Sequence, residues 1–304
     1  MQSTVVETVM QITQPPSLKH LLAVFLAVGV TFSVLERLRP AMRRCPIRPG
    51  MAVDVAYWLF TPIVTKSITS LMLVCAAFVM YLMLGWPLTA AALDGFGPLR
   101  RQPLWLQAFE MLIMADFIGY WIHRGFHYGW FWKIHAVHHS PRQLDWLSAY
   151  RMHPLNDAGS RVAQTLPLLA VGFSPMVLIP YVPFIVIYVV FLHANIRCSF
   201  GPLKYALVSP SYHRWHHTSD EEGLDCNFAT MFPIWDILFG TVHMPNREPV
   251  GFGVKDNAVP EGFVAQMLHP FGWKNPAAAA DRSGGVESFT DGPAACRAIL
   301  PTRS

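Results

Sequence analysis

Charged side chains are scarce in this chain of 304 residues. Asp, Glu, Lys and Arg together make up 14% of the sequence, whereas about 25% is usual for a soluble domain. Hydrophobic residues make up 53%, so too few charges remain to cover the surface of a water-soluble globule of this size. The same composition excludes a chain that is disordered throughout. The sequence therefore predicts a protein that lies in a membrane.

Several patterns that mark other protein classes are also missing. The net charge of +4 is small and scattered, which excludes a basic nucleic-acid-binding surface. None of the five cysteines forms a CxxC pair, so a zinc ribbon is not indicated. No glycine-rich loop follows a predicted strand, where NAD or FAD would bind, and no carboxylates stand at the helical spacing of a ferritin-like metal site. The sequence thus predicts neither a nucleic-acid partner nor a nucleotide cofactor.

Four apolar stretches are long enough to reach across a bilayer, which takes about 20 helical residues. They cover residues 18–35, 52–86, 104–122 and 162–192. As one helix, the second would be about 52 Å long at the usual rise per residue. It is therefore either one tilted span with an interfacial extension or two short helices broken near residues 65–67. The fourth contains several prolines and glycines, which predicts a hairpin of two short helices.

The basic residues indicate how these stretches cross the membrane. Five arginines follow the first stretch between positions 37 and 48, and a loop of this kind is usually cytoplasmic. If the second stretch crosses once, the third returns and the fourth is a hairpin, residues 123 and 213 lie on that same side. We therefore predict an all-α protein, an integral membrane helical bundle over residues 1–274 with a cytosolic histidine-rich helical cap formed by residues 123–160 and 193–254. Residues 275–304 are predicted to be a disordered tail.

Histidine is the residue that the chain has in excess. Ten of its 13 histidines lie between positions 123 and 217, in part as HRGFH (123–127), HAVHH (135–139) and HRWHH (213–217). Residues three or four apart lie on one face of a helix, and a neutral imidazole offers one ring nitrogen to a metal ion. A solvated or pH-sensing histidine surface is the alternative. The predicted metal ligands are His123, His127, His135, His138, His139, His213, His216 and His217.

Eight histidines are too many for one ion, because a zinc site takes four ligands and a catalytic one takes three with water. The sequence therefore predicts two ions. Imidazole suits zinc, copper, iron and nickel, so the ligand type alone leaves the metal open. Neither HxxHH motif contains the glutamate that serves as the base in an HExxH zinc protease.

Three polar residues are candidates to support the ligands. Asp116 lies seven residues before His123, so both share a helix face, and a carboxylate within an apolar stretch is a functional candidate. We expect Asp116 to accept a hydrogen bond from a ligating histidine or to lie close to the metal ions; a polar contact to another helix is the alternative. Asn195 and Asp220 are weaker candidates for the same supporting role.

Over residues 116–254 the chain resembles the fatty acid hydroxylase/sterol desaturase superfamily of integral-membrane, non-haem di-iron oxygenases. The resemblance rests on the three histidine motifs in their order and on four further stretches: SAYRMHP (148–154), LHAN (192–195), NFA (227–229) and WDILFGT (235–241). It implies two iron ions, activation of O₂ and a lipid substrate. It also implies that His193 is a ninth ligand and that His153 is a ligand or supports one.

These features predict a membrane-bound oxygenase with no catalytic residue beyond the metal centre. We expect it to hydroxylate, or alternatively to desaturate, an unactivated C–H bond of a lipid with O₂. No electron-carrier domain is visible in 304 residues, so electrons are expected from a cytochrome b5- or ferredoxin-type partner with its reductase. The composition favours a bacterial inner membrane over the endoplasmic reticulum. A membrane hydrolase with two zinc ions and a non-enzymatic metal transporter or sensor are the alternatives.

Overall fold

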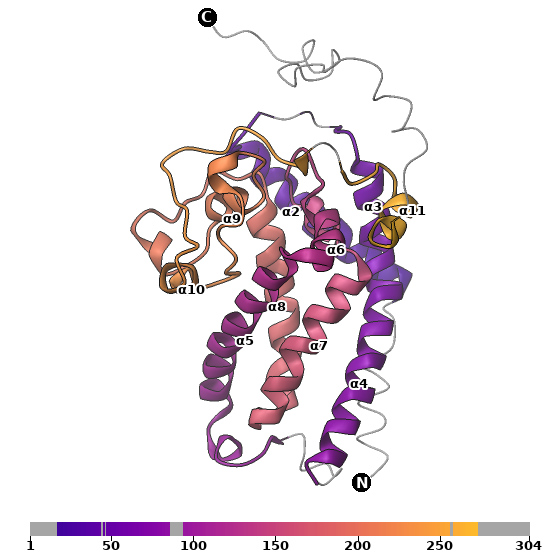
Figure 1. The fold of residues 1–304 in the computed structure, drawn as a ribbon, viewed down its shortest axis with the longest axis vertical. Helices are drawn as coiled ribbons and strands as arrows, with labels where there is room; N and C mark the ends of the chain where they lie inside the picture. The colour runs from indigo at the N-terminus through magenta and orange to yellow at the C-terminus, as the bar shows by residue number, and fades with distance from the viewer. Residues whose placement is uncertain (1–16, 44, 46, 86–93, 256–257, 273–304) are drawn as a thin grey trace, which may run out of the picture.

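Helices account for the regular structure of the chain. The computed structural model describes residues 17–43, 45, 47–85, 94–255 and 258–272 (Figure 1). Within these ranges the backbone pairs as β-structure only at two isolated bridges, Pro40–Ile196 and Thr218–Phe252. This confirms the all-α class, whereas the predicted tail at 275–304 lies outside the described residues.

Four long helical stretches form a bundle (Figure 1). In the first, α3 (Met51–Phe60), the π-helical turn η1 (Thr61–Thr65) and α4 (Lys66–Met83) form one continuous helix of 33 residues. Pro62 in η1 lacks the N–H that an α-helix uses, and the π-turn accommodates this gap without ending the helix. The other three are α5 (Leu104–Phe126), α7 (Pro154–Val171) and α8 (Pro175–His193). One long helix therefore replaces the alternative of two short helices broken near residues 65–67.

Among the described residues, three helices are long and apolar enough to cross a membrane, namely α2 (Leu18–Leu38), the helix over Met51–Met83 and α8. Most of their residues are not buried inside the protein, and an exposed apolar surface of this extent marks contact with a membrane. α5 and α7 carry more polar side chains and bury some of them, including Gln107 and Asn156. The three apolar helices indicate an integral, multi-pass membrane protein.

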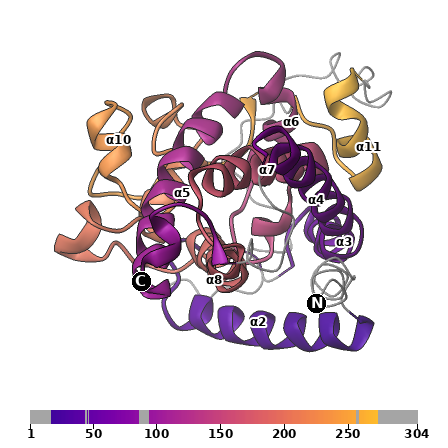
Figure 2. The ribbon, with the colours of Figure 1, turned by 90° about the horizontal axis from the view of Figure 1, so that it is seen from below.

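α2 takes a different direction from the bundle. In the view along the bundle, α2 is seen along its whole length, whereas α8 is seen nearly end-on (Figure 2). Its buried side packs against Trp58, Trp146 and Val190. Near its C-terminal end, Glu36 accepts hydrogen bonds of 2.9 Å from the backbone N–H groups of Trp146 and Asn195. Glu36 thus ties the C-terminal end of α2 to two separate segments, one around Trp146 and one just after α8.

The shorter helices gather at one end of the bundle and form a cap (Figure 1). α5 and α8 both end there, which brings their C-terminal residues beside α6 and α9. At the opposite end, Gly172 closes the turn between α7 and α8 at a φ of 108°, where an added side chain would meet the carbonyl oxygen of Phe96. The cap helices are α6 (Gly129–His139), α9 (Pro210–His216), α10 (Ile234–Leu238) and α11 (Phe263–Leu268). The 3-10 turns are η3 (Leu99–Arg101), η4 (Ser148–Tyr150), η5 (Gly201–Tyr205), η6 (Glu221–Gly223) and η8 (His269–Phe271).

Candidate metal centre

Nine histidines meet where α5, α6, α8 and α9 come together. They form two groups, and within each group one ring nitrogen per residue lies within 4.8 Å of all the others. These nine are the residues predicted as ligands, including His193. Group A consists of His123, His127, His135, His139 and His216, and group B consists of His138, His193, His213 and His217.

The two HxxHH motifs divide between the groups in a regular way. In α6, His135 and His139 belong to group A, while His138 belongs to group B. In α9 the order is reversed, because the first and last histidines join group B and the middle one joins group A. Adjacent residues on a helix are about 100° apart, whereas residues four apart are nearly in line. The sequence predicts that the imidazoles of each motif lie on one helix face; in the structure, the motifs of α6 and α9 each contribute histidines to both groups.

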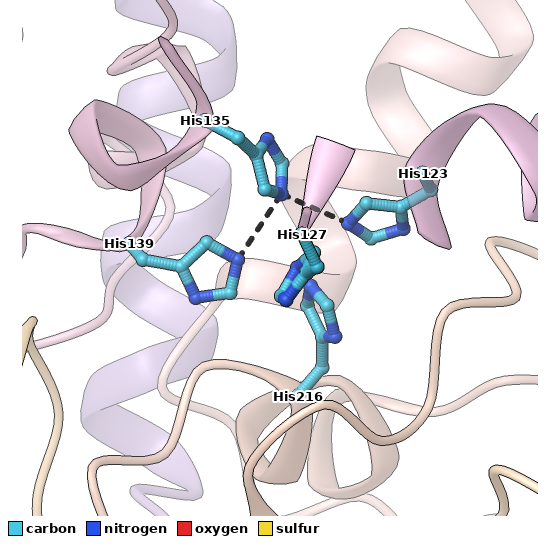
Figure 3. A group of neighbouring side chains, drawn as sticks. All are labelled: His123, His127, His135, His139 and His216. Atoms are coloured by element: carbon cyan, nitrogen blue, oxygen red, sulfur yellow. Dashed lines mark hydrogen bonds between the residues drawn. The ribbon is translucent and has the colours of Figure 1, made fainter. Parts of the chain in front are cut away.

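Group A converges through its Nε2 atoms (Figure 3). The Nε2 atom of His135 lies 3.1 Å from that of His123 and 3.1 Å from that of His139. The Nε2 atoms of His127 and His216 are buried and have no hydrogen-bond partner in the described structure. Five rings thus direct nitrogen atoms towards one point.

Group B has the same construction. The Nε2 atom of His193 lies 3.2 Å from that of His138 and 3.3 Å from that of His213. The Nε2 atom of His217 lies 3.1 Å from that of His213. All four residues are buried.

Hydrogen bonds from the other ring nitrogen fix the direction of most rings in group A. Nδ1 of His123 lies 2.7 Å from the carbonyl oxygen of Phe228, and Nδ1 of His216 lies 2.8 Å from that of Cys226. A carbonyl oxygen only accepts, so Nδ1 carries the proton and Nε2 presents its lone pair to the centre of the group. The same arrangement holds for His127 on Asp225 at 2.9 Å and for His135 on Asn156 at 2.8 Å.

In group B two main-chain carbonyls take this role. His138 donates from Nδ1 to the carbonyl of Arg151 at 3.0 Å, and His193 donates to that of Val189 at 2.9 Å. The Nε2 lone pairs of His138 and His193 therefore face the centre of group B, whereas Nδ1 of His213 and His217 is buried without a hydrogen-bond partner in the described structure. Facing lone pairs repel one another unless a cation lies between them.

The distances between the nitrogen atoms fit metal ions. Two imidazole nitrogens bound at about 2.1 Å to one ion are roughly 2.9–3.4 Å apart in octahedral or tetrahedral geometry, and the measured contacts are 3.1–3.3 Å. Burial, followed by repulsion from neighbouring imidazoles, holds the pKa of His135 and His217 well below its usual range. Both rings are therefore neutral at physiological pH, as a ligand must be. The residues present thus fit two ions, one in each group.

A buried network of ion pairs contacts group B through Arg151, whose carbonyl oxygen accepts from His138. The Arg48 guanidinium donates to Asp145 at 2.7 Å and to Asp54, and Arg151 donates to the other oxygen of Asp54 at 2.6 Å. All four side chains are nearly or fully buried. Because Arg151 also accepts the hydrogen bond of His138 at its carbonyl, the network holds the main chain that orients this ring.

The four other candidate residues do not join either group. His153 receives the N–H of Leu155 at Nδ1, and its Nε2 lies 3.1 Å from the carbonyl oxygen of Met267, so both of its ring nitrogens are used. The amide side chain of Asn195 bonds both the N–H and the carbonyl of Met42. His153 and Asn195 therefore fix chain segments, and these hydrogen bonds of His153, which was predicted to be a ligand or to support one, reach neither histidine group.

Asp116 and Asp220 also hold the chain in place. The Asp116 carboxylate accepts from the N–H groups of Met231 and Phe232 and from the indole of Trp235, at 2.8–3.0 Å. Our expectation of a hydrogen bond from a ligating histidine is therefore wrong, and the alternative of a polar contact to another element holds. Asp220 accepts from the N–H of Val250, which ties the segment after α9 to a distant loop.

The residues that sequence reasoning missed are those that support the rings. Asn156, Asp225 and Arg151 give no sign of this role in the sequence, since the first two lie 21 and 98 positions from the histidines they contact. The carbonyls of Phe228 and Cys226 carry no residue-specific signal at all. Only the folded chain brings them to the rings.

Comparison with known proteins agrees with this geometry. Residues 108–241, which contain every histidine of both groups, match the fatty acid hydroxylase family. The ornithine lipid hydroxylase OlsE of Rhizobium tropici is 31% identical over 176 residues, which cover 56% of this chain and 53% of that protein. Alkylglycerol monooxygenase of Homo sapiens is 32% identical over 147 residues, 48% of this chain and 32% of that protein. A very-long-chain aldehyde decarbonylase, GL1-6 of Oryza sativa subsp. indica, is 25% identical over 44% of this chain and 22% of its own length.

The chain thus spans about half the length of OlsE and less of the other relatives. No solved structure matches the chain. The family match covers the segment that carries the histidines. The segment that carries the histidines is therefore similar to the fatty acid hydroxylase family.

Proposed function

We propose that the protein is a membrane-bound, non-haem di-iron oxygenase that hydroxylates an unactivated C–H bond of a lipid, with O₂ and with electrons from a partner protein. One observation carries the proposal: two adjoining all-histidine groups lie at the end of an apolar helical bundle, within the segment that matches the family. Neither an exposed histidine surface nor a single structural ion explains nine converging histidines, of which seven are buried.

The part of the protein in this chemistry is to hold and orient. The nine histidines would bind two iron ions, and iron supplies the redox capacity that activation of O₂ requires. His123, His138, His193 and His216 keep their Nδ1 protons on main-chain carbonyls, so their Nε2 atoms stay available to the ions. Burial of the rings excludes water, which would otherwise compete for the ions and for the reacting carbon.

The substrate that we propose is a membrane lipid. The relatives are named for ornithine lipid and for alkylglycerol, and both names describe molecules with a polar head and an apolar chain. The bundle beneath the histidines is apolar and exposed, so such a molecule could reach the metal centre from within the bilayer. Hydroxylation is preferred over desaturation because those two names describe oxygen insertion.

The electron donor and the location are further parts of the proposal. We infer a cytochrome b5- or ferredoxin-type donor with its reductase, since the described residues include no carrier of electrons other than the histidine groups. We place the cap on the cytoplasmic side of a bacterial inner membrane, because arginines follow α2 at the cap end and positive loops face the cytoplasm.

Lipid analysis with isotopic oxygen tests the proposal. Cells that express the wild-type chain under ¹⁸O₂ should accumulate a lipid that contains one ¹⁸O atom, and cells that express His217→Ala should not. The purified protein should contain iron and should turn over only with an added reductant and donor. Zinc in both groups with a hydrolysed product formed without O₂, or transport of metal ions into vesicles without any product, would overturn the proposal.

A further inference from the structure

A polar cavity lies beside α9, on the side of this helix away from the histidines. It has a volume of about 670 Å³ and lies between the segment after α2, residues 197–204, α9 and residues 244–248. Ser211 and Trp215 of α9 line it, and they are four residues apart on the helix face roughly opposite the histidines. The cavity is therefore separate from both histidine groups.

The lining of this cavity carries a positive charge that the protein itself does not neutralise. Arg247 is paired with Glu222, and Glu248 is paired with Arg214. Across the described part of the chain, no ion pair involves Arg197 or Lys204. The Lys204 ammonium lies only over the ring of Tyr205, 5.2 Å from its centre. Two cations thus remain free to bind an anion.

Exposed apolar side chains flank these cations. On η5, Lys204 stands between Leu203 and Tyr205, and each of these neighbours is 59% exposed. At the end of α2, Leu38 is 71% exposed and precedes Arg39. Cations that alternate with exposed apolar residues are typical of a surface at the level of lipid head groups.

The cavity also lies where two candidate membrane helices end. The segments that follow α2 and α8 pair through the Pro40–Ile196 bridge, and the N–H of Arg197 donates to the carbonyl of Arg39 at 2.8 Å. Residues at the ends of membrane helices meet the head-group region of the bilayer. An anion in this cavity would therefore come from the membrane surface.

We propose that this cavity binds the phosphate group of an anionic membrane lipid. Arg197 and Lys204 contact the phosphate, and the exposed side chains of Leu203 and Tyr205 lie along the lipid chains. The proposal concerns a lipid that remains bound as a structural ligand, separate from the lipid that reacts at the histidines.

The cavity wall connects such a lipid to group B. Glu248 accepts two hydrogen bonds of 2.7 Å from Arg214 and one of 3.0 Å from Ser211. Arg214 also donates to the carbonyl oxygens of Ala194 and Ile196, which follow His193. A bound lipid therefore stabilises the junction of α8 and α9, and the expected effect is a higher temperature of unfolding.

Lipid retention by the full chain tests this proposal. The metal-loaded protein in phosphatidylcholine nanodiscs receives phosphatidylglycerol, and native mass spectrometry measures the lipid that stays bound. The wild type should retain phosphatidylglycerol about tenfold better than phosphatidylcholine, and the variant R197A/K204A should lose this preference, because a factor of ten corresponds to the contribution of one or two charged contacts. R101A, which removes an exposed arginine of η3 just before α5 begins, serves as the matched control and should keep it.

Two further measurements keep the outcome decisive. Metal content shows whether each variant is folded, and the single variants R197A and K204A should each lose part of the preference if the double variant is unstable. Inorganic phosphate should not displace the lipid, since it lacks the apolar contacts. An unchanged preference in folded R197A/K204A, or binding of inorganic phosphate as tight as that of phosphatidylglycerol, would overturn the assignment of a lipid.

Discussion

The two histidine groups use the same side chain, but they are held in different surroundings. All four residues of group B are buried, whereas His123 and His127 of group A keep some exposure. The ring of His127 rests on Asp225, whose side chain is 63% exposed. The ring of His138 rests on the carbonyl of Arg151, inside a buried ion network. The comparison indicates one closed, rigid site and one whose ligands are partly held by a surface loop.

The loop beside group A, residues 225–229, is fixed by hydrogen bonds over only part of its length. Its inner half is held by Asp236, which accepts from the N–H groups of Phe228 and Ala229. Asn227 adopts a φ of 59° and bonds the N–H and carbonyl of His243 with its side chain. Asp225, at the outer end, has no comparable support from Asp236. The two groups therefore differ in how their rings are supported: His138 of group B rests on a buried main-chain carbonyl, whereas His127 of group A rests on an exposed carboxylate.

The largest effect should follow from removal of one ligand in either group. His138→Ala in group B and His216→Ala in group A should each lower turnover by more than about 100-fold, the upper range for loss of a mere supporting residue. Each should also lower the metal content from about two ions per chain to about one. Elemental analysis and turnover of the reconstituted enzyme measure both. Membrane insertion should be unchanged, and a variant with two ions and near-normal turnover would contradict the assigned ligands.

Acidification should affect both groups of the metal-free protein alike. Burial, and then the neighbouring imidazoles, hold the pKa of His139 and His216 in group A and of His138 and His213 in group B well below its usual range. Below about pH 6.5 the unfolded chain therefore binds more protons than the folded chain. The free energy of unfolding decreases as the pH is lowered, by up to ~1.4 kcal/mol per pH unit for each ring.

Denaturant unfolding between pH 8 and pH 5 measures this loss. Metal-loaded protein should lose less stability over the first part of the range, because bound ions keep the rings unprotonated. A metal-free protein whose unfolding free energy is constant from pH 8 to pH 5 would show that the rings are not buried as the structure has them.

Removal of one charge from the ion network should separate the groups. Arg48→Met leaves the buried charge of Asp145 uncompensated, while Asp54 keeps Arg151, and this costs about 3–5 kcal/mol of stability. Because the network holds Arg151, the affinity for the ion of group B should fall while that of group A is retained. Calorimetric metal titration and denaturant unfolding measure these effects.

A matched control tests whether burial causes the effect. Arg161→Met breaks an i,i+4 pair with Asp157 in which the arginine side chain is 34% exposed, so it should cost about 1 kcal/mol or less. Equal losses in Arg48→Met and Arg161→Met, or an equal fall of metal affinity in both groups, would contradict the special role of the network.

The sequence was enough to predict which histidines come together, because their signal is local. Imidazoles at i, i+3 and i+4 can be read directly from HAVHH and HRWHH, and the parity of apolar stretches places α5 and α8 so that both end at one cap. The all-α class and the candidate membrane helices α2, Met51–Met83 and α8 follow from length and composition, whereas the predicted stretch at 104–122 is not among the candidate spans in the described part of the chain. The ninth ligand, His193, came from a family resemblance, since a lone histidine at the end of an apolar stretch has no spacing to mark it.

The rest depends on contacts between distant residues. Arg48 and Asp145 are 97 positions apart, and nothing near either one predicts their partner. The division of adjacent His138 and His139 between two ions requires the positions of two helices at once. Asp116 is an example of a partner that the sequence does not indicate. Its spacing from His123 within one helix can be read from the sequence, but the N–H groups of residues 231 and 232, which donate to its carboxylate, lie more than 100 positions away.

The smallest effect should come from the exposed partner in group A. Asp225→Ala removes the acceptor of the His127 Nδ1–H, and water can replace it because the site is exposed. The affinity for the ion of group A should fall about tenfold, the lower end for a supporting residue, while that of group B stays unchanged. Asn156→Ala, which removes the buried acceptor of His135, should cost more because no water reaches it. Asp94→Ala, an exposed aspartate paired with Arg100 at the far end of the bundle, is the control. If Asp225→Ala weakens group B as much as group A, the two groups do not differ in the way that their surroundings indicate.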